Sequence, residues 1–295
     1  MRLSKYLLLC GSLLFSHAAA AADLPQRWVS SGGSLSEWVV RLGGEGKLVG
    51  VDTTSLHPQT LRQLPSIGYQ RALSAEGVLS LRPDILIGSE EMGPPPVIAQ
   101  IKAAGIRIET LSAKPDLETL ERNVLRLGEL LGAPERAREE MAAYRQRLQR
   151  QADWVARVRE KQQAPRVLML LGHAGSNVMA AGKDSLAVWL IEHAGGESRT
   201  EHSGYKPISN EALLAMDPQV VIFADRSLHG EEARKALLQQ NPVLQQTSAA
   251  RDGRLLTLDP TLLVGGLGPR LPEGLAELSA AFYPSEQALT AKLDR

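Results

Sequence analysis

The sequence predicts an α/β protein of two Rossmann-like lobes with parallel sheets, joined by one long connecting helix. Three observations support this fold class. Short β-type runs alternate with helical runs along most of the chain, which is typical of parallel α/β units. One stretch occurs twice, as SAEGVLSLRPDILI at 74–87 and as SNEALLAMDPQVVI at 209–222. Between the two copies, residues 135–163 consist mainly of strong helix formers and carry almost no turn signals.

The chain begins with a predicted secretory signal peptide at residues 1–22. Two basic residues precede a short apolar run at 6–15, and the alanines at 18–22 supply A-x-A cleavage sites. The apolar run is too short to span a bilayer in the mature protein. The only cysteine, Cys10, lies inside this run directly after Leu9, which argues against a lipid anchor and leaves the mature chain without disulfides. We therefore expect a soluble protein of the periplasm.

The N-terminal lobe is predicted at residues 23–132. A first strand lies near Trp28, and the S-x-x-E pattern from Ser34 to Glu37 predicts a capping box that opens the first helix. Ser74 is expected to cap a short helix that ends at Pro83. The other elements predicted for this lobe are strands at 48–51, 84–87 and 106–108, and helices that end near Gly105 and Leu131.

The connecting helix is predicted at residues 133–164. If 135–163 forms one helix, it spans about 43 Å. Its apolar positions are sparse, which is also typical of an ordinary solvated surface helix. The position between the two copies of the repeat favours a stiff strut between the lobes.

The C-terminal lobe is predicted at residues 165–295, where the strand and helix pattern restarts after Pro165. Strands are expected at 167–171, 220–224 and 255–258, and helices after Pro272 and Ser285. The glycine-rich segment 265–268 is interpreted as a turn, because it does not open a helix after a strand as a phosphate-binding loop does.

Composition and motifs argue against several function classes. The chain has 33 basic and 33 acidic residues, so its charge gives no reason to expect nucleic acid as a partner. It has no G-x-S-x-G elbow, P-loop or dinucleotide-binding motif, so we predict no enzymatic activity. The histidines form no H-x-x-x-H pair, so nothing supports a direct metal-ion binder. A non-transport periplasmic enzyme on the same scaffold is an alternative, because fold alone does not determine function.

Several stretches resemble a known family. A signal peptide, two α/β lobes, a long connecting helix and a Glu…Leu-x-Pro-Asp segment resemble the substrate-binding proteins of ABC importers for siderophores, cobalamin and haem. Within that class, residues 48–58, 64–88 and 203–222 are similar to the periplasmic haem-binding proteins. The resemblance implies that ferric haem is captured in a cleft between the lobes, as the transported ligand. It is then delivered to an inner-membrane ABC permease with its ATPase.

The same resemblance implies further partners and one alternative. An outer-membrane haem receptor system would act upstream, and we expect the protein to be a monomer. A binding protein for a ferric siderophore or cobalamin is the alternative within the class. It would share the fold and the docking residues but would not need a tyrosine ligand.

The resemblance also points to individual residues. In the haem-binding family, a tyrosine in the segment that matches 68–71 ligates the haem iron, which points to Tyr69. A phenolate is a hard anionic oxygen that suits Fe(III). Arg71 is the cation expected to stabilise it. The class also uses one glutamate in each lobe to dock on basic residues of the permease, and Glu76 and Glu211 match those positions. An acid in the first turn of a helix also favours the helix dipole, which is the structural alternative.

Other residues are candidates for the cleft itself. Haem propionates require cations at the rim, and we expect these from Arg71, Lys206 and Arg226. Tyr205, the counterpart of Tyr69 beside the second copy of the repeat, is expected to line the cleft. His173 follows a predicted strand and is a further candidate to face the ligand, although the sequence favours an exposed loop histidine.

Overall fold

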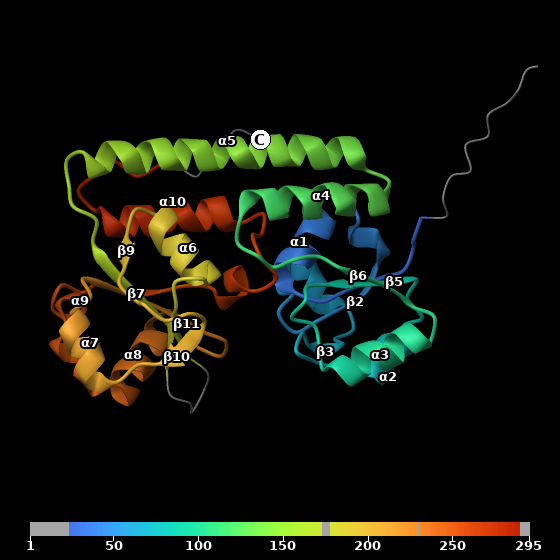
Figure 1. Cartoon of the computed structure of the whole chain (residues 1–295), viewed down its shortest axis with the longest axis horizontal. Coiled ribbons are helices and arrows are strands. Elements are labelled where there is room, and N and C mark those ends of the chain that lie inside the picture. The colour runs from blue at the N-terminus through green and yellow to red at the C-terminus, as the bar shows by residue number, and fades with distance from the viewer. Residues whose placement is uncertain (1–23, 173–177, 229, 290–295) are drawn as a thin grey trace, which may run out of the picture.

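The computed structural model describes residues 24–172, 178–228 and 230–289 (Figure 1). The predicted signal peptide, Cys10 and His173 lie outside the described residues. Two α/β lobes lie side by side, and the long helix α5 (Pro134–Arg159) runs across both of them (Figure 1). The predicted α/β class of two lobes and one long helix is therefore confirmed.

The first lobe is built on an all-parallel sheet in the order β2-β1-β5-β6. Its strands are β1 (Trp28–Ser30), β2 (Leu48–Val51), β5 (Ile85–Gly88) and β6 (Arg107–Thr110). A small hairpin of β3 (Gly68–Tyr69) and β4 (Ala72–Leu73) lies beside it. Its helices are α1 (Gly33–Arg41), α2 (Ala75–Ser80), α3 (Pro95–Ala103) and α4 (Leu117–Leu131), with short 3₁₀ turns at Glu45–Lys47 and Gln59–Gln63.

The second lobe has a mixed sheet in the order β10-β8-β7-β11-β12, with β9 beside β7. Its strands are β7 (Arg166–Gly172), β8 (Met179–Ala181), β9 (Glu197–Ser198), β10 (Tyr205–Pro207), β11 (Val220–Asp225) and β12 (Leu255–Thr257). Its helices are α6 (Leu186–His193), α7 (Asn210–Met216), α8 (Gly230–Gln240), α9 (Ser248–Arg251) and α10 (Leu271–Phe282), with 3₁₀ turns at Pro242–Gln246 and Pro260–Leu263.

This second sheet differs from the purely parallel sheet that the sequence predicts. Strands β7, β9, β11 and β12 are parallel, whereas β8 pairs antiparallel with both β7 and β10. The connection between β7 and β8 covers only residues 173–178, and so short a link between neighbouring strands requires the antiparallel arrangement.

The repeated stretch folds in the same way in both lobes. Ser74 and Ser209 are the N-caps of α2 and α7, and each side chain accepts a hydrogen bond from a backbone N–H three residues on. A buried parallel strand follows each helix, β5 in one lobe and β11 in the other. The repeat is therefore a capped helix followed by a core strand.

Helix α5 joins the lobes through a single apolar stripe. Its buried positions include Met141, Tyr144, Leu148 and Val155, and they pack in one continuous core with residues of both lobes. The helix is shorter than predicted, ending near Glu160, and its length is about 39 Å. Burial of this stripe favours the strut over the solvated surface helix.

A second connection joins the lobes through residues 259–270, between β12 and α10. This segment packs on α1 of the first lobe, where Trp38 Nε1 donates to Leu267 O at 2.8 Å. Tyr144 Oη on α5 donates to Gly268 O at 3.2 Å. At Gly268 a Cβ atom would meet Ser34 Oγ at 2.7 Å, so the glycine permits this close approach. The glycine-rich segment is thus a packing surface as well as a turn.

The expected capping box is wrong. Helix α1 starts at Gly33 after Gly32, without a side-chain cap. The carboxylate of Glu37 instead binds Arg270, whose Nε and Nη2 donate to its two oxygens at 2.9 and 2.7 Å. Glu37 is only 6% exposed. Its burial raises the pKa of the carboxyl, and Arg270 opposes that effect.

The helix expected after Ser285 is a second difference from the prediction. No helix follows Ser285 within the described residues.

The ion pair between Glu37 and Arg270 predicts that two arginine variants differ widely in their free energy of unfolding. Arg270→Ala leaves the Glu37 carboxylate buried without its cation, so we expect the free energy of unfolding to fall by roughly 3 kcal/mol. Arg41→Ala, which removes a more exposed ion pair with Glu140, should lower it by less than about 1 kcal/mol. Urea denaturation of both variants measures the difference, and equal losses would contradict this role of Arg270.

Candidate functional site

Tyr69 lies on a hairpin whose backbone requires glycine. Gly68 has a φ of 95°, and a Cβ there would lie 2.8 Å from Ala72 O, so a larger residue would prevent the β3–β4 pairing. The loop after β5 binds the same hairpin, because Gly93 N donates to Gln70 O and Leu73 N donates to Gly93 O. These bonds hold the half-buried Tyr69 at the edge of the first lobe.

Tyr69 faces a cleft of about 770 Å³ between the lobes. Residues from both lobes and from the crossing segment 259–270 line this cleft, many of them just after the ends of β5, β6, β7 and β11. Ligands of open α/β sheets bind at such carboxyl ends. The lining residues are Tyr69 to Arg71, Glu90, Glu91, Ala113 to Pro115, Leu171, Gly172, Met179, Asp184 to Leu186, Gly204, Tyr205, Ala224, Arg226, Pro260 and Leu263 to Gly266.

Arg226 of the second lobe contacts Tyr69 directly. Its Nη2 donates a hydrogen bond to Tyr69 Oη at 2.6 Å. Its guanidinium carbon lies 4.4 Å from the centroid of the phenol ring, which is a cation–π distance. This pair spans the cleft and places the permanent positive charge of the Arg226 guanidinium next to the phenol oxygen. The sequence analysis predicts Arg71 beside Tyr69 and Arg226 at the propionates. In the structure, the cation beside Tyr69 is Arg226 instead.

Arg71 is engaged elsewhere in the cleft. Its Nη2 forms a short ion pair with Glu91 Oε1, and Gln70 Nε2 donates to Glu91 Oε2 at 3.0 Å. Gln70 is buried, and its Oε1 has no hydrogen-bond partner in the described part of the chain. Arg71 therefore lines the cleft, where the sequence analysis expected it. Its counterion Glu91 is a residue that the sequence analysis missed.

The three remaining candidates for the cleft, Tyr205, Lys206 and His173, differ in where they lie. Tyr205 lines the opposite wall, where burial raises the pKa of its phenol while a hydrogen bond with Ser185 opposes the shift. Lys206 is the next residue on β10 and is exposed, so it does not line the described cleft, since neighbouring strand residues point to opposite faces. His173 falls outside the described residues.

Sequence reasoning missed six polar residues of the cleft, namely Gln70, Glu90, Glu91, Lys114, Asp184 and Ser185. One signal could have found Glu91. The pair Glu90-Glu91 follows the buried strand β5 within three residues of its end, where ligand sites of parallel sheets form. No comparable signal marks Asp184.

Glu76 and Glu211 lie away from the cleft, in the first turns of α2 and α7. Both are exposed, and neither forms an ion pair within the described residues. Figure 1 shows α2 and α7 on different lobes, each on the side opposite α5. The two helices that carry these glutamates therefore lie on the same side of the molecule.

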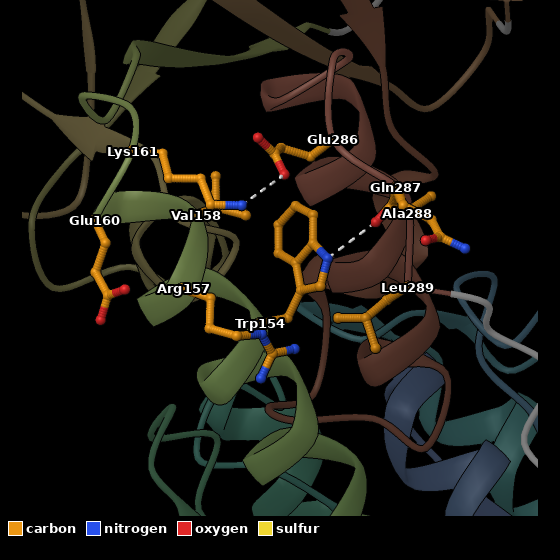
Figure 2. A pocket seen from close by; sticks show the side chains of 9 residues that line it. All are labelled: Trp154, Arg157, Val158, Glu160, Lys161, Glu286, Gln287, Ala288 and Leu289. Carbon is orange, nitrogen blue, oxygen red and sulfur yellow. Dashed lines mark hydrogen bonds and ion pairs between the residues drawn. The ribbon is translucent and has the colours of Figure 1, made fainter.

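A second hollow of about 440 Å³ lies at the C-terminal end of α5 (Figure 2). Trp154 forms part of its wall and donates from Nε1 to Gln287 O at 3.0 Å. Lys161 and Glu286 form a 3.8 Å ion pair at its edge. It shares no lining residue with the cleft that contains Tyr69.

Two further features bear on the kind of site. In residues 24–172, 178–228 and 230–289, no group of three or more His, Cys, Asp or Glu side chains could hold a metal ion. None of the described helices combines the length and apolar character that crossing a bilayer requires. The described cleft therefore offers two phenols, two arginines, a lysine and three carboxylates to its ligand.

The known proteins that are similar to this chain are substrate-binding proteins. Residues 29–262 match the family described as periplasmic binding protein. A periplasmic haem-binding protein from Pseudomonas aeruginosa is 66% identical, with a TM-score of 0.89 over 90% of this chain and 96% of that chain. A periplasmic haem-binding protein from Roseiflexus sp. RS-1 is 32% identical, with a TM-score of 0.78 over 89% and 99%. An uncharacterised ABC transporter substrate-binding lipoprotein of Bacillus subtilis is 25% identical over 88% of this chain and 81% of its own length.

Proposed function

Because the chain belongs to the periplasmic binding protein family and, within it, to the haem-binding proteins, we propose that it captures ferric haem in the cleft and delivers it to an inner-membrane ABC permease. The observation that carries this is the 66% identity to the Pseudomonas aeruginosa protein over 90% of the chain. The predictions of the family, of haem as ligand, of a periplasmic location and of a binding protein in place of an enzyme are confirmed. The same 66% identity favours haem over the siderophore and cobalamin alternative.

Tyr69 is the proposed ligand of the haem iron. A phenolate that binds iron is stabilised by a cation close to its oxygen. Arg226 supplies one at 2.6 Å, and the iron of the bound haem supplies another. The phenolate oxygen has lone pairs for both, so Arg226 can keep its hydrogen bond while the iron binds.

The second lobe and the rim complete the proposed site. Leu171, Met179 and Leu263 offer apolar contacts to the porphyrin faces, and Arg71 lies where it can reach a propionate. Lys206 is exposed on β10, so its proposed contact with a propionate needs a side chain that extends back over the rim. Tyr205 is proposed to contact the porphyrin from the opposite wall.

Glu76 and Glu211 are the proposed docking residues for the permease. They are exposed, they occupy equivalent positions of the repeat, and their helices α2 and α7 both lie on the side opposite α5 (Figure 1). Exposed ion pairs contribute only up to about 1 kcal/mol each, which suits a contact that forms and separates in every transport cycle. An outer-membrane haem receptor is the proposed source of the ligand, and the protein is proposed to act as a monomer.

Haemin titration of the apoprotein and of two tyrosine variants tests the proposed ligand. Tyr69→Phe removes the ligating oxygen but keeps the ring under Arg226, so haem affinity should fall about a hundredfold or more, equivalent to roughly 3 kcal/mol. The high-spin tyrosinate spectrum should disappear with it. Tyr205→Phe, the matched variant in the other lobe, should keep that spectrum. An unchanged spectrum in Tyr69→Phe would rule out Tyr69 as the ligand.

Charge reversal tests the docking face. The double variant Glu76→Lys and Glu211→Lys should reduce haem transport into proteoliposomes that contain the permease by about tenfold, because both contacts become repulsive. Its haem affinity should equal that of the wild type. Glu118→Lys, an exposed first-turn acid of α4, serves as the control and should transport normally. If haem binding and transport decline together, the two glutamates have a structural role instead.

A further inference from the structure

Three acids and three bases line the cleft, namely Glu90, Glu91, Asp184, Arg71, Lys114 and Arg226. Two of the acids are bound by backbone amides. Glu90 accepts from Ala113 N at 3.0 Å, and Asp184 accepts from Gly204 N at 2.7 Å. Glu91 differs from them, because its carboxylate is bound to a guanidinium that itself faces the cleft. It is therefore the lining acid that occupies a cation which an anionic ligand would need.

Both carboxylate oxygens of Glu91 are engaged, and the two bonds differ in character. The partner of Oε1 is Arg71, whose side chain is 57% exposed and therefore able to move. The partner of Oε2 is the amide of Gln70, which is 1% exposed. The backbone of Gln70 is fixed in turn by Gly93 N. If Arg71 leaves, Gln70 still holds Glu91 in place.

We propose that Glu91 is a built-in counterion that ligand carboxylates displace from Arg71, and that it thereby sets the affinity of the cleft for carboxylate-bearing ligands. The inference rests on the proposed function, in which haem presents two propionates. Binding then exchanges one ion pair for another, and no new charge pair is gained. The exchange limits haem affinity, which favours release at the permease.

This role predicts a gain of affinity from a loss of charge. Glu91→Gln keeps an oxygen for Gln70 Nε2 and removes the competitor for Arg71, so haem should bind about two- to fivefold more tightly, the range expected for a partly exposed ion pair. A merely structural role for Glu91 would weaken binding instead. The affinity is measured by haemin titration and by the rate of haem transfer to excess apomyoglobin.

Three comparisons make the test specific. In an Arg71→Ala background, the substitution Glu91→Gln should no longer tighten binding, because no cation is released. With haemin whose two propionates are methyl esters, Glu91→Gln and wild type should bind equally. Glu90→Gln removes the same charge from the same loop without releasing a cation, so it should change the affinity less than Glu91→Gln does.

The outcomes separate this inference from the function on which it rests. If wild-type protein does not bind haemin saturably, the proposed function fails. If wild type binds haemin but Glu91→Gln binds equally or more weakly, the function stands and the counterion role is overturned. An equal gain from Glu90→Gln, or a gain that persists without Arg71, would assign the effect to the net charge of the cleft and overturn the inference as well.

Discussion

The cleft depends on the bond between Arg270 and the buried carboxylate of Glu37. Arg270 precedes α10 of the second lobe, whereas Glu37 lies in α1 of the first, so their two hydrogen bonds attach the crossing segment to the opposite lobe. The segment runs between the sheets and contributes Pro260 and Val264 to the cleft wall. Together with α5 it gives the lobes two separate connections. A hinge between lobes joined twice is restricted, so we expect the cleft to close only modestly on its ligand.

A restricted cleft explains why its charges are already paired. A site that closes on its ligand can bring distant charges together during closure, but a rigid site has to tolerate the same charges when it is empty. The two arginines of the cleft are satisfied in different ways, Arg226 by a phenol and Arg71 by a carboxylate. In the proposed site, the phenol leaves the positive charge of Arg226 available to a phenolate that would bind iron, whereas the carboxylate would neutralise Arg71 until another anion replaces it.

Local patterns in the sequence predicted the fold and part of the site, because those features are encoded by residues that are neighbours in the chain. Caps at Ser74 and Ser209, the helix formers of α5 and the buried strands are all local signals. The pairing of the cleft residues is not local. Arg226 contacts a residue 157 positions away, and Arg71 selects Glu91 through a turn that follows another strand. The capping box failed for the same reason, since a distant arginine binds Glu37 more strongly than the adjacent helix end does.

The matched helices α2 and α7 also bear on the orientation in which the protein would dock on its permease. Each presents a capped first turn with one exposed acid at the same position of the repeat. If a permease recognises only these acids, as the proposed docking implies, it does not distinguish the two lobes and accepts the protein in either of two orientations. The proposed iron ligand does not follow the repeat, because Tyr69 belongs to one lobe. Haem would then reach the permease in two different orientations, and the translocation path would have to accept both.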